Sequence, residues 1–139
     1  MQFAPYLFFS GNCEEALNFY KDVFGGEILD VTRWKDTPDG GSQAGQGEKI
    51  MNATFKSPMV NFMAADARPT TQYGESRVSL SLATEDTEEA KRVFDSLSRG
   101  GKVEMPLEKV FWGALFGMFQ DRYGIDWMVN CQLAPVPAG

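Results

Sequence analysis

The stretch that decides the fold runs from Phe111 to Cys131 and reads FWGALFGMFQDRYGIDWMVNC. It holds two apolar segments, 114–120 and 125–131, which are separated by the polar sequence Asp121-Arg122-Tyr123-Gly124. Two apolar runs joined by a short turn that contains glycine are typical of a β-hairpin. Because both strands are too apolar to lie at a surface, the rest of the chain is expected to pack around them.

The residues before this hairpin predict a strand, a helix and another strand. Residues 77–83 alternate between polar and apolar, which indicates a half-buried strand. A helix is expected to begin near Thr84 or Asp86 and to end at Gly100-Gly101, and residues 102–107 indicate the next strand.

The first half of the chain repeats this order. A strand at 3–9, a helix at 14–24, a strand at 28–34 and a hairpin of 50–56 with 59–65 are expected. Either Ser10 or Asn12 is a candidate cap for this helix. The helix starts match as well, since Glu14-Glu15-Ala16 corresponds to Glu88-Glu89-Ala90 and a glycine pair follows each helix.

This repeat predicts an α+β fold of two βαβββ modules, with the helices on the convex face of the sheets and a concave cleft. One domain is expected over 1–139, with a first module at about 1–66, a second at about 76–131 and a tail at 132–139. Residues 66–75 are interpreted as the linker between the modules. Residues 35–48 are rich in glycine and are expected to form a long connecting loop.

Composition excludes several classes of function. Thirteen basic and nineteen acidic residues give a net charge of −6, which argues against nucleic acid or an anionic membrane as partner. No apolar run approaches 18 residues, and no signal peptide is visible, so a cytoplasmic location is expected. Two cysteines are too few for a disulfide scaffold. Cys13 lies at a predicted helix start, where a thiol pKa can fall, but no base accompanies it, and packing is the preferred interpretation.

The chain contains no histidine. Histidine is the commonest general base near neutral pH and a common metal ligand, so a Ser-His or Cys-His pair and any metal site built on imidazole are excluded. Any chemistry would have to use carboxylates, hydroxyls, lysine, arginine or cysteine.

Six segments of the chain resemble the PhnB-like branch of the vicinal oxygen chelate superfamily, which includes glyoxalase I, extradiol dioxygenases and bleomycin-resistance proteins. They are 5–9 (PYLFF), 11–16 (GNCEEA), 49–53 (KIMNA), 111–114 (FWGA), 121–124 (DRYG) and 127–130 (WMVN). The branch also carries the label 3-demethylubiquinone-9 3-methyltransferase-like. No glycine-rich loop after a strand supports an adenosyl cofactor here, and no cofactor is expected.

In metal-dependent members, four inward-facing residues hold a divalent ion. The resemblance places these positions at Pro5, Phe62, Arg77 and Met128, none of which suits a hard divalent cation. We therefore expect no metal.

A concave surface that includes Arg77 and Met128 would bring polar and aromatic groups together in a ligand pocket. Arg77 is expected either to bind an anionic ligand group or to pair with Asp126 or Glu75. Trp127 is expected in the core. The candidate ligand-binding residues are Arg77, Ser79, Asn52, Phe62, Trp112, Phe119, Asp126, Met128 and Asn130.

The expected function is metal-free binding of a small organic molecule in the cleft. The alternatives are a metal-dependent isomerase, lyase or dioxygenase with non-histidine ligands, and a drug-sequestering resistance protein. Large apolar side chains at the module ends also predict a homodimer. They are Phe3, Tyr6, Phe8, Phe62, Phe111, Trp112, Phe116 and Phe119.

Overall fold

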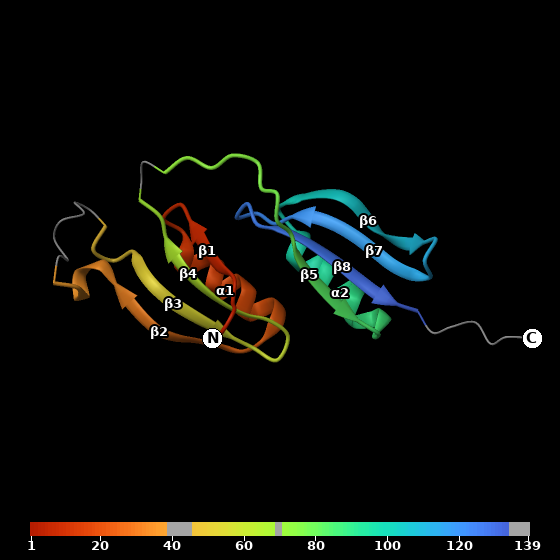
Figure 1. The fold of residues 1–139 in the computed structure, drawn as a ribbon, viewed down its shortest axis with the longest axis horizontal. Helices are drawn as coiled ribbons and strands as arrows, with labels where there is room; N and C mark the ends of the chain where they lie inside the picture. Colours follow the sequence, from red (N-terminus) through yellow and green to blue (C-terminus); the bar gives the residue numbers. More distant parts are fainter. Residues whose placement is uncertain (39–45, 69–70, 134–139) are drawn as a thin grey trace, which may run out of the picture. The chain divides into compact units, whose positions relative to one another are not determined.

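The structure is a computed structural model that describes residues 1–38, 46–68 and 71–133. It contains two compact units, the first spanning Met1–Tyr73 and the second beginning at Gly74 (Figure 1). The first unit consists of β1 (Tyr6–Phe9), α1 (Cys13–Phe24), β2 (Glu27–Arg33), the short helix η1 (Trp34–Asp36), β3 (Ile50–Lys56) and β4 (Asn61–Asp66). The second consists of β5 (Leu80–Thr84), α2 (Thr87–Ser98), β6 (Lys102–Val110), β7 (Ala114–Gln120) and β8 (Asp126–Gln132).

Both sheets have the same topology, which confirms the predicted pair of βαβββ modules. The strand order is β1-β4-β3-β2 in the first sheet and β5-β8-β7-β6 in the second. The first strand of each unit is parallel to the last, and the other neighbours are antiparallel. The hairpin on which the fold was predicted is β7–β8, and its register pairs Phe119 with Trp127.

Each helix covers one face of its own sheet. In β8 the side chains of Trp127, Val129 and Cys131 are buried, whereas the residues between them are half-buried. Since successive strand residues point to opposite faces, one face of this sheet is core and the other lies open. The ring of Phe94 on α2 meets Phe119 edge-on at 5.0 Å, so α2 lies on the core face.

Hydrogen-bonded pairing explains where the strands differ from the sequence-based ranges. β1 begins at Tyr6 rather than residue 3, because Tyr6 opposite Met63 is the first matched pair with β4. β8 continues to Gln132, which pairs with Ala114, so the tail predicted to begin at 132 starts one residue too early. Residues 134–139 of that predicted tail, and residues 39–45 of the predicted loop, lie outside the described residues.

The edge strand β2 is irregular. Its register against β3 shifts between Leu29 and Thr32, and Asp30 adopts a positive φ of 52° there. A bulged edge strand pairs poorly with a second sheet, and such bulges protect open edges from association.

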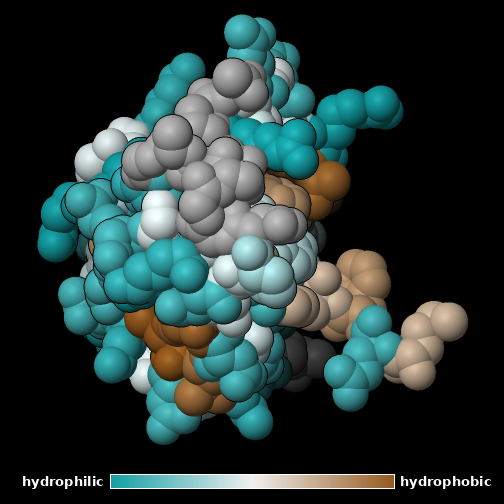
Figure 2. Space-filling view, turned by 90° about the vertical axis from the view of Figure 1, so that its left-hand side faces the viewer, coloured by the Kyte–Doolittle hydropathy of each residue, from teal (hydrophilic) through white to brown (hydrophobic). Residues whose placement is uncertain are grey.

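Figure 2 shows a side of the molecule that is mainly hydrophilic, with a smaller hydrophobic area.

Candidate functional site

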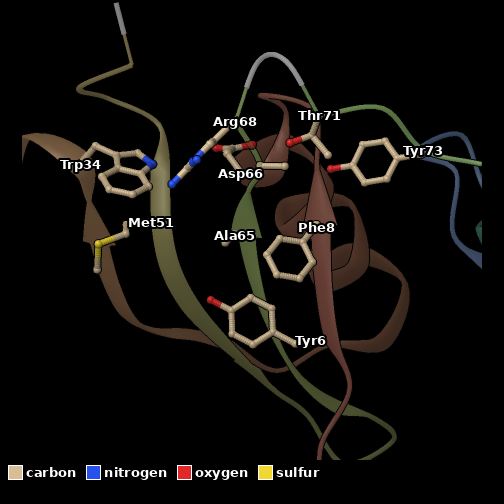
Figure 3. A pocket seen from close by; sticks show the side chains of 10 residues that line it. Tyr6, Phe8, Trp34, Met51, Ala65, Asp66, Arg68, Thr71 and Tyr73 are labelled. Carbon is tan, nitrogen blue, oxygen red and sulfur yellow. The ribbon is translucent and has the colours of Figure 1, made fainter. Parts of the chain in front are cut away.

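The first unit forms a pocket of about 450 Å³ on the face of its sheet opposite α1 (Figure 3). β1 supplies one wall through strand alternation. Leu7 and Phe9 are buried on the helix side, whereas Tyr6 and Phe8 are 40% and 51% exposed on the open side. The rings of Tyr6 and Phe8 stack with their centroids 4.9 Å apart, so they offer a continuous aromatic surface.

The remaining walls come from β3, from η1 and from the chain that follows β4. In Figure 3 the Trp34 indole and the Tyr73 ring stand on opposite sides of the pocket, with Ala65 between them. Ala65 pairs with Phe8 across the parallel strands, and its small side chain leaves room above the sheet. The lining residues are Tyr6, Phe8, Trp34, Met51, Ala65, Asp66, Ala67, Arg68, Thr71 and Tyr73.

Asp66, which lines the pocket, connects the end of β4 to α1 and β3 through hydrogen bonds. Its side chain is 6% exposed, and its Oδ1 accepts a hydrogen bond of 2.8 Å from the backbone N–H of Cys13. Its Oδ2 accepts one of 2.9 Å from the N–H of Ile50. Asn12 occupies the N-cap position but makes no capping hydrogen bond with its side chain, so neither predicted local cap serves α1. The carboxylate from β4 takes that role, since the first N–H groups of a helix need acceptors.

In the second unit, the start of the helix is capped by a residue next to it in the sequence. α2 is capped locally by Asp86, whose Oδ1 accepts from the N–H of Glu89 at 3.1 Å. Cys131, near the end of β8, lies 4.0 Å from the hydroxyl of Thr87 at the start of α2. Cys131 therefore occupies the strand position that Asp66 holds in the first unit, and Thr87 occupies the helix position that Cys13 holds.

Burial disfavours the thiolate form of Cys13, whose side chain is not exposed to solvent. Desolvation, followed by the negative charges of Asp66 and Glu14, raises the pKa of Cys13 to about 12. This outweighs the lowering that a helix N-terminus usually produces. The structure therefore agrees with the interpretation of Cys13 as a packing residue.

The hydroxyl of Tyr6 connects the pocket to Asn52, a predicted site residue. Tyr6 donates a hydrogen bond of 3.1 Å to Oδ1 of Asn52. Desolvation, and to a smaller extent the nearby Cys13, raises the pKa of Tyr6, so this phenol stays protonated at neutral pH. Asn52 thus orients an aromatic wall of the pocket.

Two of the basic residues in this part of the first unit are paired with acids. Arg33 contacts Glu14 at 2.5 Å, and the hydrogen bond to Glu14 is the main cause that raises the pKa of Arg33. Lys35 contacts Glu48 at 2.7 Å, and that hydrogen bond is the main cause that lowers the pKa of Glu48. Arg68 has no ion pair among the described residues.

A smaller cavity of about 180 Å³ adjoins the aromatic pocket. The two cavities share Ala67, Arg68 and Thr71. Lys49 lines the smaller one and donates a hydrogen bond of 2.7 Å to the carbonyl oxygen of Gly11. The other lining residues are Ser10, Gly11 and Gln46, which makes this cavity the more polar of the two.

Of the nine predicted ligand-binding residues, Phe62 and Phe119 are wrongly placed by the sequence argument. Both are nearly fully buried on the helix side of their sheets. Phe62 meets Tyr20 of α1 edge-on at 5.6 Å, and Phe119 meets Phe94 of α2. Strand parity is the reason, because Phe119 lies opposite the core residue Trp127 and therefore shares its face.

The predicted residues Trp112, Asp126, Met128 and Asn130 belong to the second unit. The indole N–H of Trp112 donates a hydrogen bond of 3.2 Å to Oδ1 of Asn130. Asp126 accepts one of 3.2 Å from the amide of Gln120. Asp126, Met128 and Asn130 alternate with the buried core residues and so share the open face of the second sheet.

Arg77 and Ser79 precede β5, although both were expected within a strand. The side chain of Arg77 is exposed. Within the described ranges, neither Asp126 nor Glu75 forms an ion pair with it. Its role as a ligand-binding residue remains a prediction.

Sequence reasoning missed the residues that line the aromatic pocket. The run of aromatic and apolar residues at 3–9 predicts a buried strand, but the side chains of Tyr6 and Phe8 alternate with the buried Leu7 and Phe9 and face the pocket. The segment after β4 was read as a linker, yet it supplies Arg68 and other lining residues. No sequence pattern placed it beside β1, because only the parallel β1–β4 pairing does so.

The side chains do not fit the metal site of the superfamily. Phe62 lies in the core, and Pro5 and Met128 offer no hard oxygen ligand. Among the described residues, no three cysteine, aspartate or glutamate side chains gather closely enough to hold a metal ion.

Two α+β units of this topology, each with one helix-covered and one open sheet face, define a protein of the glyoxalase/bleomycin-resistance/dioxygenase fold. A superfamily member from Sphaerobacter thermophilus, 20% identical, agrees in fold with a TM-score of 0.57 over 95% of this chain and 98% of its own. None of the helices in the described parts of the chain is long and apolar enough to span a membrane.

Closer relatives define the family. The model of the family described as 3-demethylubiquinone-9 3-methyltransferase matches residues 1–130, and the chain belongs to this PhnB-like family. Protein YjdN of Escherichia coli K12 is 31% identical, with 94% of this chain and 95% of YjdN covered. Protein PA1353 of Pseudomonas aeruginosa is 41% identical with a TM-score of 0.85, covering 96% and 99% of the two chains. A PhnB protein from Bacillus cereus is 31% identical with a TM-score of 0.79, covering 96% and 100%.

Proposed function

We propose that this chain binds a small organic molecule, without a metal, in the aromatic pocket of its first unit. The observation that carries the proposal is the stacked pair of Tyr6 and Phe8, which stays exposed beside a hollow of about 450 Å³. A concave, mostly apolar surface with a few polar groups at its rim is what a small-ligand site needs. A planar ligand would stack on these rings and shield them from water.

The lining supports binding more than catalysis. Asp66 is the one carboxylate among the lining residues, and backbone N–H groups engage both of its oxygens. A carboxylate held in this way is poorly placed to take a proton from a ligand. The same feature favours sequestration of an organic compound as the second candidate function, since sequestration requires no catalytic group. The alternative of a metal-dependent isomerase, lyase or dioxygenase has no support from the described side chains.

We further propose that the protein is cytoplasmic and forms a homodimer. Phe3 and Phe111 are 97% and 96% exposed, and Trp112 is 45% exposed. Phe62 and Phe119 are buried and cannot contribute to a dimer interface. The exposed Phe3, Phe111 and Trp112 still support one. Sedimentation equilibrium at micromolar concentration tests the proposal. A mass of twice 15.5 kDa is expected, and a monomer mass that does not change with concentration would refute the dimer.

Binding is tested by isothermal titration calorimetry with 2-naphthol, a neutral aromatic probe. Saturable binding with a Kd below about 1 mM is expected. Phe8→Ala removes one ring of the stacked pair without opening the core, since Phe8 points away from α1. It should weaken binding about fivefold, corresponding to about 1 kcal/mol for one aromatic contact.

Val78→Ala is the control, because it shortens an exposed apolar side chain that lies in the other unit. It should leave the affinity for 2-naphthol unchanged. If 2-naphthol, 2-naphthoate and 2-naphthyl phosphate all fail to bind, or if both variants weaken binding equally, the proposal is wrong.

A further inference from the structure

We infer that the ligand of this pocket is an aromatic molecule that carries an oxyanion, with its ring in the aromatic pocket and its anionic group in the adjoining polar cavity. This inference rests on the proposed function and names its ligand class. The two cavities share the lining residues Ala67, Arg68 and Thr71, and the proposal places one molecule across them. Figure 3 shows Arg68 and Thr71 together at one end of the aromatic pocket, above the rings of Phe8 and Tyr6.

The charges of the first unit support an anionic group at that end. Two basic side chains of the first unit, Arg33 and Lys35, are paired with glutamates. Arg68 and Lys49 line the polar cavity and form no ion pair with any acidic side chain in the described ranges. In a chain of net charge −6, this cavity is lined by two cations and by no acidic side chain among its described residues.

The one acidic side chain at this junction does not cancel them. Asp66 lines the aromatic pocket, but it is buried and directs its two oxygens at the N–H groups of Cys13 and Ile50. Arg68 is exposed, so its guanidinium can turn toward a ligand. A guanidinium binds carboxylate or phosphate through two parallel hydrogen bonds, and the hydroxyls of Ser10 and Thr71 add neutral donors. Lys49 stays on Gly11 and contributes its charge.

Ring-matched probes separate this inference from the proposed function. Titrations with 2-naphthol, 2-naphthoate and 2-naphthyl phosphate compare a neutral ring with two anionic forms of the same ring. At least one anion should bind about tenfold more tightly than 2-naphthol, the advantage of a charge-assisted hydrogen bond. The tighter of the two anions identifies carboxylate or phosphate as the preferred group.

The matched variants are Arg68→Gln and Arg99→Gln, which remove the same charge from the pocket and from the end of α2, respectively. Arg68→Gln should abolish the advantage of the anion over 2-naphthol, whereas Arg99→Gln should change neither this advantage nor the affinity for 2-naphthol. Arg68→Lys should restore part of the advantage, because it keeps the charge but not the planar donor pair.

Binding of 2-naphthol with no preference for either anion would refute the inference and leave the proposed function intact. So would an anion preference that survives Arg68→Gln. Failure of all three probes would refute both proposals. Circular dichroism of each variant confirms that it is folded before its affinity is compared.

Discussion

Replacing Asp66 with asparagine should destabilise the first unit strongly, although the two side chains have nearly the same shape. The carboxylate accepts from Cys13 at 2.8 Å and from Ile50 at 2.9 Å, and it is 6% exposed. Asparagine has one acceptor oxygen, so its amino group must face the second N–H group. One charge-assisted hydrogen bond is lost, one becomes neutral, and a buried donor is left unsatisfied.

The magnitude follows from these losses. A hydrogen bond to a charged group contributes about 1.5–3 kcal/mol, and an unsatisfied buried donor costs about 1–3 kcal/mol. Allowing for their overlap, Asp66→Asn should lower the free energy of unfolding by about 2–4 kcal/mol. With an m-value of about 2 kcal/mol/M in urea, the midpoint should fall by about 1–2 M.

Urea unfolding followed by circular dichroism at pH 7 is the assay. Asp22→Asn is the control, since Asp22 is an exposed carboxylate on α1, the helix that Asp66 caps, and its replacement should change the midpoint little. Amide hydrogen exchange of Cys13 and Ile50 should also speed up in Asp66→Asn alone. If the midpoint of Asp66→Asn stays within the range of Asp22→Asn, the assignment of Asp66 as the anchor of α1 is incorrect.

Three further predictions concern buried groups. Because the pKa of Cys13 rises from 9.0 to about 12 on folding, the unfolded state releases this proton first. The free energy of unfolding should therefore fall as the pH rises above about 9, and it should fall less in Cys13→Ala. Alkylation of Cys13 at pH 8 should require urea, which exposes the thiol. Trp127→Phe removes the 2.9 Å hydrogen bond from the indole to Asp121 and should cost about 1–3 kcal/mol in urea unfolding, whereas a loss below about 0.5 kcal/mol would contradict it. Gly117→Ala places a Cβ 2.6 Å from the ring of Phe94 and should lower the thermal midpoint through about 1–3 kcal/mol of strain; an unchanged midpoint would show that α2 can shift.

The sequence by itself determined the modules of this protein. Alternation of polar and apolar residues in 77–83, apolar runs such as 125–131 and helical spacing in both helices are local patterns, so they predicted the strands, the helices and the repeat. The absence of histidine excluded imidazole chemistry without any structure. The hairpin of β7 and β8 was predictable for the same reason, since its turn lies between two contiguous apolar segments.

Only the tertiary structure decided which face of each strand meets the helix and where the pocket lies. Phe62 and Tyr6 are both aromatic strand residues, yet the pairing of β4 with β1 places them on opposite faces. The cap of α1 is Asp66, which accepts a hydrogen bond from the N–H group of a residue 53 positions away in the sequence. Arg68 reaches the pocket for the same reason, because it follows β4 and β4 pairs with β1. Contacts of such long sequence separation depend on strand order and register, and no local pattern of residues contains that information.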